Sequence, residues 1–206
     1  MLIGLCGLPR NGKGTIANYL KETWGFKHTK MAGTLKDMLR VMLRDTGMDD
    51  VLIERMIEGD LKETPQPFLG NTTPRWAMQT LGTEWGRLCL CPTIWGDIWQ
   101  LGAMKHIDDG RSVVVDDVRF PDEQERVKRL GGIIIHVTGR SGAASEHASD
   151  KMDWMDAEYT IENNGSLEEL RLKVDKLIRE IRDDIWGTQQ PLPYRQGNSE
   201  EAGSDN

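Results

Sequence analysis

The sequence has few of the features that mark secreted, membrane or nucleic-acid-coating proteins. Its three cysteines, Cys6, Cys89 and Cys91, are too few for a disulfide framework, and a Cys-x-Cys pair alone lacks the further ligands of a zinc site. No apolar run approaches the roughly 20 residues of a membrane span, and no basic segment precedes a long apolar stretch at the N-terminus. A net charge of -7 argues against nucleic-acid coating. We therefore expect a cytoplasmic protein with no membrane partner and no nucleic-acid partner.

Short apolar runs alternate along the chain with segments of helical periodicity, which is typical of an open α/β sheet. With 206 residues, of which 38% are apolar, the chain is long enough for one packed domain with an inserted subdomain. The expected strands are 2–6, 26–31, 112–117, 132–138 and 159–162, and the expected helices outside the insertion are 15–24, 34–44, 121–130 and 166–185. We predict a parallel sheet of about five strands flanked by helices.

No strand is expected between residues 50 and 108, where the pattern is helical over 51–58 and over 73–107, with an interruption near Pro92. This stretch predicts a helical insertion over about residues 46–108. From residue 187 onward the chain is rich in Gln, Pro, Gly, Ser and acids, so residues 187–206 are expected to form a disordered tail. The folded domain therefore spans residues 1–186.

The stretch GLPRNGKGT follows the first expected strand and opens the first expected helix. Its glycines let backbone N–H groups turn toward an anion at the positive end of the helix, and the ammonium of Lys13 can reach the outer phosphates of a nucleoside triphosphate. Gly14 stands where a hydroxyl residue usually follows the lysine, and Thr15 comes one residue later. The residues expected to bind the triphosphate are Gly7, Arg10, Asn11, Gly12, Lys13, Gly14 and Thr15.

Two acids follow the expected strand in VVVDDVRFPDE. Acids at the carboxyl end of a buried parallel strand point into the crevice where ligands of open α/β sheets bind, and one of them can organise Mg²⁺ for phosphoryl transfer. Because adjacent strand residues face opposite sides, only one of the pair is expected to face the metal. The pattern favours Asp117 with Asp116 as the alternative, and Arg119 can grip a phosphate with two parallel hydrogen bonds.

The stretch TPRWAMQTLGTEWGR places polar residues at intervals of four along one slowly drifting helical stripe. Those residues are Arg75, Gln79, Thr83 and Arg87. Gly82 and Gly86 are costly inside a helix, so their presence indicates a close approach by another backbone or a ligand. A solvated polar face is the alternative interpretation of the stripe.

Taken together, GLPRNGKGT, MAGTLKDML, MQTLGTEWGR, DVRFPDE and the HASD at 147–150 resemble the deoxynucleoside monophosphate kinases of bacteriophages, and the loop alone resembles that of the adenylate-kinase group. The resemblance spans about residues 1–185. It implies a P-loop kinase fold that passes the γ-phosphoryl group of ATP to a deoxynucleoside 5′-monophosphate in the host cytoplasm. ATP and Mg²⁺ are the expected cofactors, and small-molecule nucleotides are the expected partners.

The resemblance also implies roles for individual residues. Lys13 and its loop hold ATP, and Lys13, Asp117, Arg119 and Arg140 carry catalysis. Residues 139–155 form a lid that begins beside Arg140. The acceptor is expected to contact Lys36, Arg75, Gln79, Thr83, Arg87 and Arg119. Because Gly14 offers no side-chain oxygen, Mg²⁺ is expected to be held through water by Asp117 or Asp116.

Two other functions remain open from the sequence. A P-loop kinase that phosphorylates a hydroxyl, similar to dephospho-coenzyme A kinase, has a segment like Asn163 to Leu170, and Asp116 or Asp117 would then accept the hydroxyl proton. A nucleotide-binding switch module without phosphoryl transfer is the second alternative. The preferred base, the selection of deoxyribose over ribose and the assembly state, for which a homodimer is one option, do not follow from the sequence.

Overall fold

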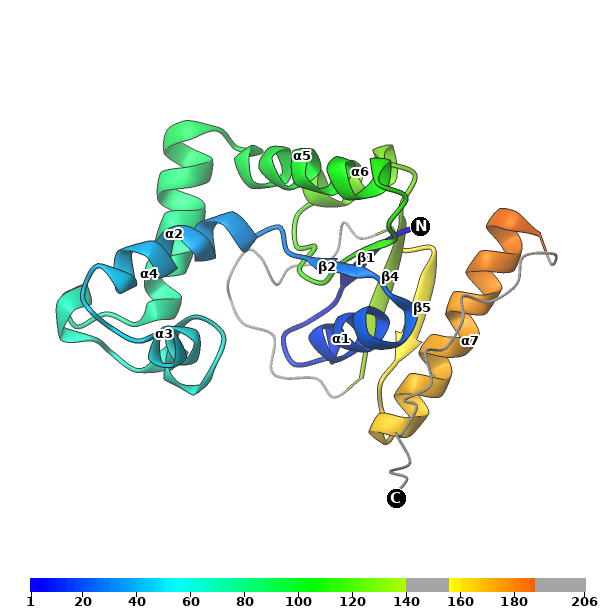
Figure 1. The fold of residues 1–206 in the computed structure, drawn as a ribbon, viewed down its shortest axis with the longest axis horizontal. Helices are drawn as coiled ribbons and strands as arrows, with labels where there is room; N and C mark the ends of the chain where they lie inside the picture. The colour runs from blue at the N-terminus through cyan, green and yellow to red at the C-terminus, as the bar shows by residue number, and fades with distance from the viewer. Residues whose placement is uncertain (140–155, 188–206) are drawn as a thin grey trace, which may run out of the picture.

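The computed structural model describes residues 1–139 and 156–187. Within them, five strands form one sheet in the order β2-β3-β1-β4-β5, and every neighbouring pair is parallel (Figure 1). The strands are β1 (Leu2–Cys6), β2 (Lys27–Thr29), β3 (Val113–Val115), β4 (Ile133–Thr138) and β5 (Tyr159–Glu162). The expected parallel α/β sheet is confirmed, and its order, with the glycine loop directly after β1, fits a P-loop kinase fold.

Helices cover both faces of the sheet (Figure 1). Helices α1 (Lys13–Trp24) and α7 (Leu167–Trp186) pack on one face, and α5 (Ile94–Asp108) and α6 (Pro121–Arg129) pack on the other. None of the helices in the described ranges is long and apolar enough to cross a bilayer. The chain therefore has the three layers that bury a parallel sheet on both sides.

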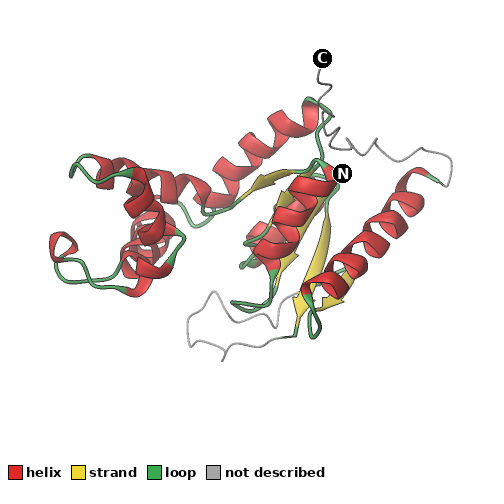
Figure 2. Cartoon of the chain, turned by 60° about the horizontal axis from the view of Figure 1, so that its bottom comes forward, coloured by secondary structure: helices red, strands yellow, loops and turns green. Residues whose placement is uncertain are grey.

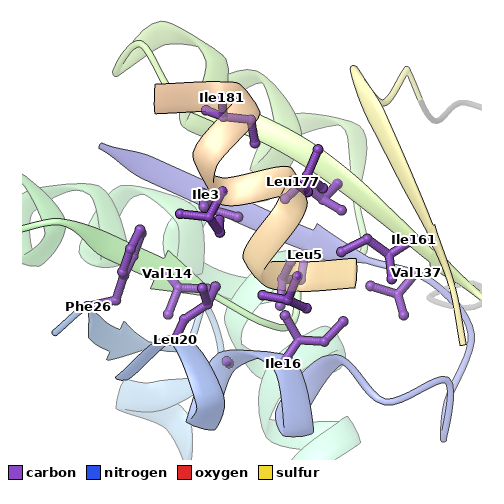
Figure 3. Packing of buried hydrophobic residues seen from close by; sticks show 14 of the residues in the cluster. Ile3, Leu5, Ile16, Leu20, Phe26, Val114, Val137, Ile161, Leu177 and Ile181 are labelled. Atoms are coloured by element: carbon purple, nitrogen blue, oxygen red, sulfur yellow. The ribbon is translucent and has the colours of Figure 1, made fainter. Parts of the chain in front are cut away.

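Strand β1 shows why a strand of this sheet appears in the sequence as a continuous apolar run. Ile3 and Leu5 contribute to the core beneath α1 and α7, whereas Leu2 and Cys6 contribute to the core beneath α5 and α6. In Figure 3 the side chain of Leu5 lies beside Ile16 of α1 and near the helix that carries Leu177. Since alternate residues face opposite layers and both layers are buried, every position of the strand is apolar or small.

The helical insertion lies to one side of the sheet and has a core of its own (Figure 2). Helices α2 (Gly33–Arg44), α3 (Asp50–Ile57) and α4 (Pro74–Thr80) enclose buried side chains that include Leu39, Leu43, Ile57, Met78 and Trp95. Two 3₁₀ turns, η1 (Asp60–Glu63) and η2 (Pro67–Leu69), connect α3 to α4. Its separate core makes the insertion a distinct body beside the sheet.

The helical stretch expected over 73–107 breaks between Leu90 and Ile94, near Pro92 as the sequence indicates, but its first part changes from α4 into a π-helix, η3 (Leu81–Leu90). The indole Nε1 of Trp95 donates a hydrogen bond to the carbonyl oxygen of Gly82 at 2.7 Å. A Cβ atom on Gly86 would lie 2.5 Å from the same ring. Gly86 therefore admits a close approach, but by the side chain of Trp95 instead of the backbone or ligand that the sequence indicated, whereas a Cβ on Gly82 would meet only Leu35 at 3.4 Å.

Candidate active site

The loop between β1 and α1 lies on the side of the sheet that faces the insertion (Figure 1). Gly7 and Gly12 have φ values of 138° and 96°, in the region that favours glycine. A Cβ atom on Gly7 would collide with the carbonyl oxygen of Val137, and one on Gly12 would lie 2.5 Å from the amide nitrogen of Asn163. Arg10, at the exposed tip, also has a positive φ of 68°. Gly7 and Gly12 thus stand where no side chain would fit, and this fixes the path of the loop.

Lys13 is the first residue of α1 and folds back over this loop. Its Nζ atom donates hydrogen bonds to the carbonyl oxygens of Gly7 and Leu8 at 2.6 and 2.8 Å. Burial, together with the positive charge of Arg119, lowers the pKa of Lys13 to about 8. No side chain caps the start of α1 and its own first turn has no acid, so no residue of the helix itself competes for its positive end.

Asn11 and Asn163 attach the loop to the ends of β4 and β5. The amide of Asn11 is buried and donates to the carbonyl oxygen of Val137 at 2.9 Å, while the amide of Asn163 donates to the carbonyl oxygen of Asn11 at 3.0 Å. The sequence assigned Asn11 to the triphosphate, yet its side chain holds the loop in place. The role of Asn163 was not predicted, because residues 11 and 163 lie far apart in the sequence and only the fold brings them into contact.

The two acids after β3 point in different directions. Asp117 accepts backbone N–H groups through both oxygens, from Met31 at 2.7 Å and from Ala32 at 3.1 Å, and so holds the chain where it enters α2. Asp116 is only 8% exposed, and its Oδ2 atom lies 3.5 Å from the position that a Cβ on Gly14 would take. Although the sequence favours Asp117 for the metal, it is Asp116 that faces the loop.

Asp116 is paired with His28, a residue of the neighbouring strand β2. His28 Nε2 lies 3.1 Å from Asp116 Oδ1. Burial would raise the pKa of Asp116, but the contact with His28 and the charges of Lys30 and Lys36 outweigh it, so the pKa lies below its usual range. Asp116 is therefore a carboxylate at neutral pH. His28 gives no sequence signal, since it contributes one residue to a short strand.

Arg119 is half-buried, and its guanidinium forms no hydrogen bond or ion pair with the described residues. Its backbone N–H donates to Glu123 Oε2 at 2.7 Å, which fixes the main chain beneath the side chain. The charge of Arg119 lowers the pKa of Lys13 on the loop and that of Lys62 on the insertion. Arg119 therefore lies close enough to interact electrostatically with the loop and with the insertion.

Lys62, on η1, is a site residue that the sequence did not reveal. It is half-buried, and its pKa is lowered to about 8 by burial, by Lys36 and by Arg75, with a smaller effect from Arg119. A cluster in which cations depress one another's pKa favours an anion between them. Lys62 lies in an irregular segment without periodicity, so no pattern could single it out.

Lys36 and Arg75, both expected at the acceptor, flank Lys62 and have carboxylate partners. Lys36 Nζ lies 2.9 Å from Glu58 Oε1, and Arg75 pairs with Glu63. Burial opposes the shift, but Lys36 and Lys30 together lower the pKa of Glu58 to about 2. Gln79 and Thr83 are half-buried, and their side chains form no hydrogen bond with the described residues.

Arg87 faces the start of α6, and its guanidinium also donates a hydrogen bond to the carbonyl oxygen of Pro92 at 2.7 Å. It donates to Asp122 Oδ1 at 3.1 Å and to Glu123 Oε1 at 2.7 Å, and it lies 4.0 Å over the ring of Phe120. Burial raises the pKa of Glu123 to about 8, against the hydrogen bond from Arg119 N–H and the charge of Arg87. The structure thus separates Arg87 from the cluster of Lys62, Lys36 and Arg75, in contrast to the stripe that the spacing indicates.

Two expectations concern residues that the structure does not describe, and a third concerns Thr15. Arg140 and residues 140–155, to which the lid is assigned, lie outside the described residues, as do residues 188–206 of the expected tail. Thr15 is exposed in the first turn of α1.

Comparison with known proteins identifies relatives over much of the chain. A family model described as deoxynucleotide monophosphate kinase matches residues 68–174. A protein of Acanthamoeba polyphaga mimivirus that carries the same description is 32% identical over 158 residues, which cover 71% of this chain and 77% of that protein. The deoxynucleotide monophosphate kinase of Escherichia phage RB69 is 32% identical over 125 residues, covering 57% of this chain and 51% of the relative. Dephospho-CoA kinase from Campylobacter jejuni is similar in structure with a TM-score of 0.48 at 17% identity, over 89% of this chain and 98% of the other.

Proposed function

The chain belongs to the deoxynucleotide monophosphate kinase family and phosphorylates a deoxynucleoside monophosphate, and we propose that ATP donates the phosphoryl group with Mg²⁺ bound to its phosphates. The observation that carries this assignment of sites is the position of Arg119, whose charge acts on Lys13 of the loop and on Lys62 of the insertion. A group between two phosphate sites is what phosphoryl transfer between two nucleotides requires.

The donor site is the loop between β1 and α1. Its inward-turned backbone and the positive end of α1 bind the phosphates of ATP, and Thr15 supplies a hydroxyl in the first turn. Lys13 leaves the carbonyl oxygens of Gly7 and Leu8 and follows the γ-phosphoryl group, whose oxygens gain charge during transfer. The lowered pKa of Lys13 supports this role, because a bound phosphate would restore the stability of its ammonium form.

The acceptor site lies where the insertion meets the end of β3. We assign the acceptor phosphate to Lys62 and Arg119, with Lys36 and Arg75 beside them. Gln79 and Thr83 of α4 and η3 remain proposed contacts for the nucleoside. Arg87 takes a positioning role in place of the expected acceptor contact, since Glu123 binds Arg87 with one oxygen and the Arg119 N–H with the other.

The chain's own residues fit a metal that is bound mainly by substrate phosphates. Mg²⁺ usually retains several waters and takes one or two carboxylates together with phosphate oxygens, and the acids after β3 supply one buried carboxylate that faces the loop. When bound, the ion neutralises charge on the transferring group. No three His, Cys, Asp or Glu side chains gather into a metal cluster within the described ranges.

No general base is needed for this reaction. A nucleotide phosphate has a second pKa of about 6, so at neutral pH it is already a nucleophile. What the protein must supply is alignment and positive charge, which Arg119, Lys13 and Lys62 provide. A hydroxyl acceptor would instead need a carboxylate within reach of its proton.

A single coupled assay tests the proposal. The purified protein is supplied with ATP and Mg²⁺, and ADP release is measured with each of the four deoxynucleoside monophosphates, with their ribose counterparts and with dephospho-coenzyme A. We expect at least one deoxynucleotide to stimulate ADP release with formation of its diphosphate. Stimulation by dephospho-coenzyme A alone, or ADP release that no acceptor changes, would contradict the proposal.

A further inference from the structure

Glu58 lies at the end of α3, and its carboxylate binds two lysines from different parts of the chain. The Oε1 atom of Glu58 accepts hydrogen bonds from Lys30 Nζ and from Lys36 Nζ, each at 2.9 Å. Lys30 follows β2 and Lys36 belongs to α2, so the two bonds connect α3 to the exit from the sheet and to the first helix of the insertion. Lys36 is a proposed acceptor contact, whereas Glu58 and Lys30 have no part in the reaction described above.

The stability of α3 does not explain why an acid stands at this position. Glu58 is the C-cap residue of the helix, where the partial negative charge of the helix end disfavours an anion. Gly59 follows in a tight turn, since a Cβ there would lie 2.8 Å from the Cα of Arg55. Although burial opposes the shift, Lys36 and Lys30 lower the pKa of Glu58 to about 2, so the side chain is a carboxylate at neutral pH. The two lysines therefore stabilise its charge.

The same two lysines belong to the cations around the proposed acceptor site. The side chains of Lys36 and Lys30 are 12% and 30% exposed. The charge of Lys36 lowers the pKa of Lys62 on η1, and the charge of Glu58 acts on Lys62 in the opposite direction. Both Lys30 and Lys36 also act on Asp116 at the end of β3. An anion that binds among these cations must therefore share them with Glu58 or replace it.

We propose that Glu58 is an internal competitor of the acceptor phosphate: its carboxylate occupies Lys30 and Lys36 in the free enzyme, and a dianionic phosphate displaces it. The inference rests on the proposed function and adds Lys30 to the groups that bind the acceptor. A phosphate monoester carries about 1.5 to 2 negative charges at pH 7, whereas Glu58 carries one. Anions with a single charge gain no advantage over Glu58, so the competition selects dianions.

The direct test compares the KM for the deoxynucleotide in wild type and Glu58→Gln, with sodium sulfate as the inhibitor. Sulfate is a dianion that accepts no phosphoryl group. We expect Glu58→Gln to lower both the KM and the inhibition constant of sulfate by about threefold or more, because the lysines no longer give up bonds to a carboxylate. The dissociation constant of ATP should stay close to the wild-type value.

Two variants distinguish competition from a structural role in which Glu58 only braces α3 against α2. Glu58→Asp keeps the charge, so its KM and its inhibition by sulfate should stay closer to wild type than those of Glu58→Gln. Lys36→Met removes one of the lysines for which the anions compete, so Glu58→Gln should lower the KM by a smaller factor in that background. Glu125→Gln, which removes an acid from an exposed pair with Arg129, controls for net charge.

Melting temperatures provide a second readout that does not require turnover. Without the carboxylate the cations repel one another, so sulfate should raise the melting temperature of Glu58→Gln by more than that of wild type. If wild type phosphorylates a deoxynucleotide but Glu58→Gln leaves the KM and the inhibition by sulfate unchanged, or weakens both, the inference is overturned and the proposed function stands. If wild type phosphorylates no deoxynucleotide, the proposed function fails, and an equal response of both proteins to sulfate overturns the inference as well.

Discussion

Arg87 of η3 and Glu123 of α6 are joined by a 2.7 Å ion pair that ties the helical insertion to the segment carrying Arg119. Glu123 is 4% exposed, and its other oxygen accepts the N–H of Arg119 at 2.7 Å. A single buried carboxylate thus connects an arginine of the insertion to the main chain of the proposed catalytic arginine. Deleting Arg87 should therefore act on the fold first and on acceptor binding through Arg119.

Arg87→Ala is predicted to destabilise the protein. It removes the hydrogen bond that Arg87 donates to the buried carboxyl group of Glu123, which costs about 1–3 kcal/mol. Urea unfolding monitored by circular dichroism measures the loss. The double variant Arg87→Met with Glu123→Gln should recover part of it, because the buried residue at position 123 then carries no ionisable group. Unchanged stability together with a raised KM for the deoxynucleotide would show that Arg87 binds the acceptor directly, as the sequence stripe indicates.

Lys13→Met is predicted to abolish most of the catalysis without unfolding the protein. The ammonium is expected to compensate charge on the transferring group, so kcat should fall by about 100-fold or more. Its folded-state pKa of about 8 lies below the usual 10.5, so the charged form is penalised in the fold at neutral pH, and wild-type stability should rise as pH increases from about 8 to 10.5. Removing the charge should therefore not lower the melting temperature at pH 7. Near-normal turnover would contradict the donor site.

Lys62→Met is predicted to raise the KM for the deoxynucleotide by about tenfold, since one charged hydrogen bond to a phosphate is lost. The dissociation constant of ATP should change by less than about twofold. Lys105→Met on α5 provides a control for loss of a lysine elsewhere. An equal effect of Lys62→Met on ATP and on the acceptor would place Lys62 outside a dedicated acceptor site.

The lowered pKa of Lys62 also predicts a pH dependence. Free enzyme loses the Lys62 proton as pH rises through about 8, so kcat/KM for the deoxynucleotide at saturating ATP should fall above that pH. Lys62→Arg should shift the fall to higher pH, because a guanidinium stays protonated. A profile that is identical in wild type and Lys62→Arg would assign the ionisation to another group.

The strands and the loop follow from local sequence, whereas the pairing of side chains across the site does not. The bounds of β1 (Leu2–Cys6) and β5 (Tyr159–Glu162) match the expected ranges, because apolar runs bounded by turns are sufficient to define them. The π-helix η3 was not predicted, since it accompanies the packing of Trp95 against Gly86, a tertiary contact. Helix propensity alone does not report such a contact.

The choice between Asp116 and Asp117 also depends on contacts between residues that are distant in the sequence. Neighbouring residues near a strand end face opposite sides, so the sequence restricts the metal to one acid, and it favoured Asp117, whereas in the structure Asp116 faces the loop. The decision depends on Met31 and Ala32, whose N–H groups bind Asp117, and on His28, which contacts Asp116. These partners are far away in sequence, and only the fold brings them together.

The measurement that tests the central claim most directly is the separate titration of ATP and of the deoxynucleotide with wild type and Arg119→Lys. Lysine keeps the charge but loses the planar, two-pronged geometry of the guanidinium, so kcat/KM for the deoxynucleotide should fall by about tenfold or more, equivalent to about 1.4 kcal/mol or above. The dissociation constant of ATP should change by less than about twofold. Loss of ATP binding with an unchanged acceptor KM would contradict the account, because Arg119 would then belong to the donor site alone.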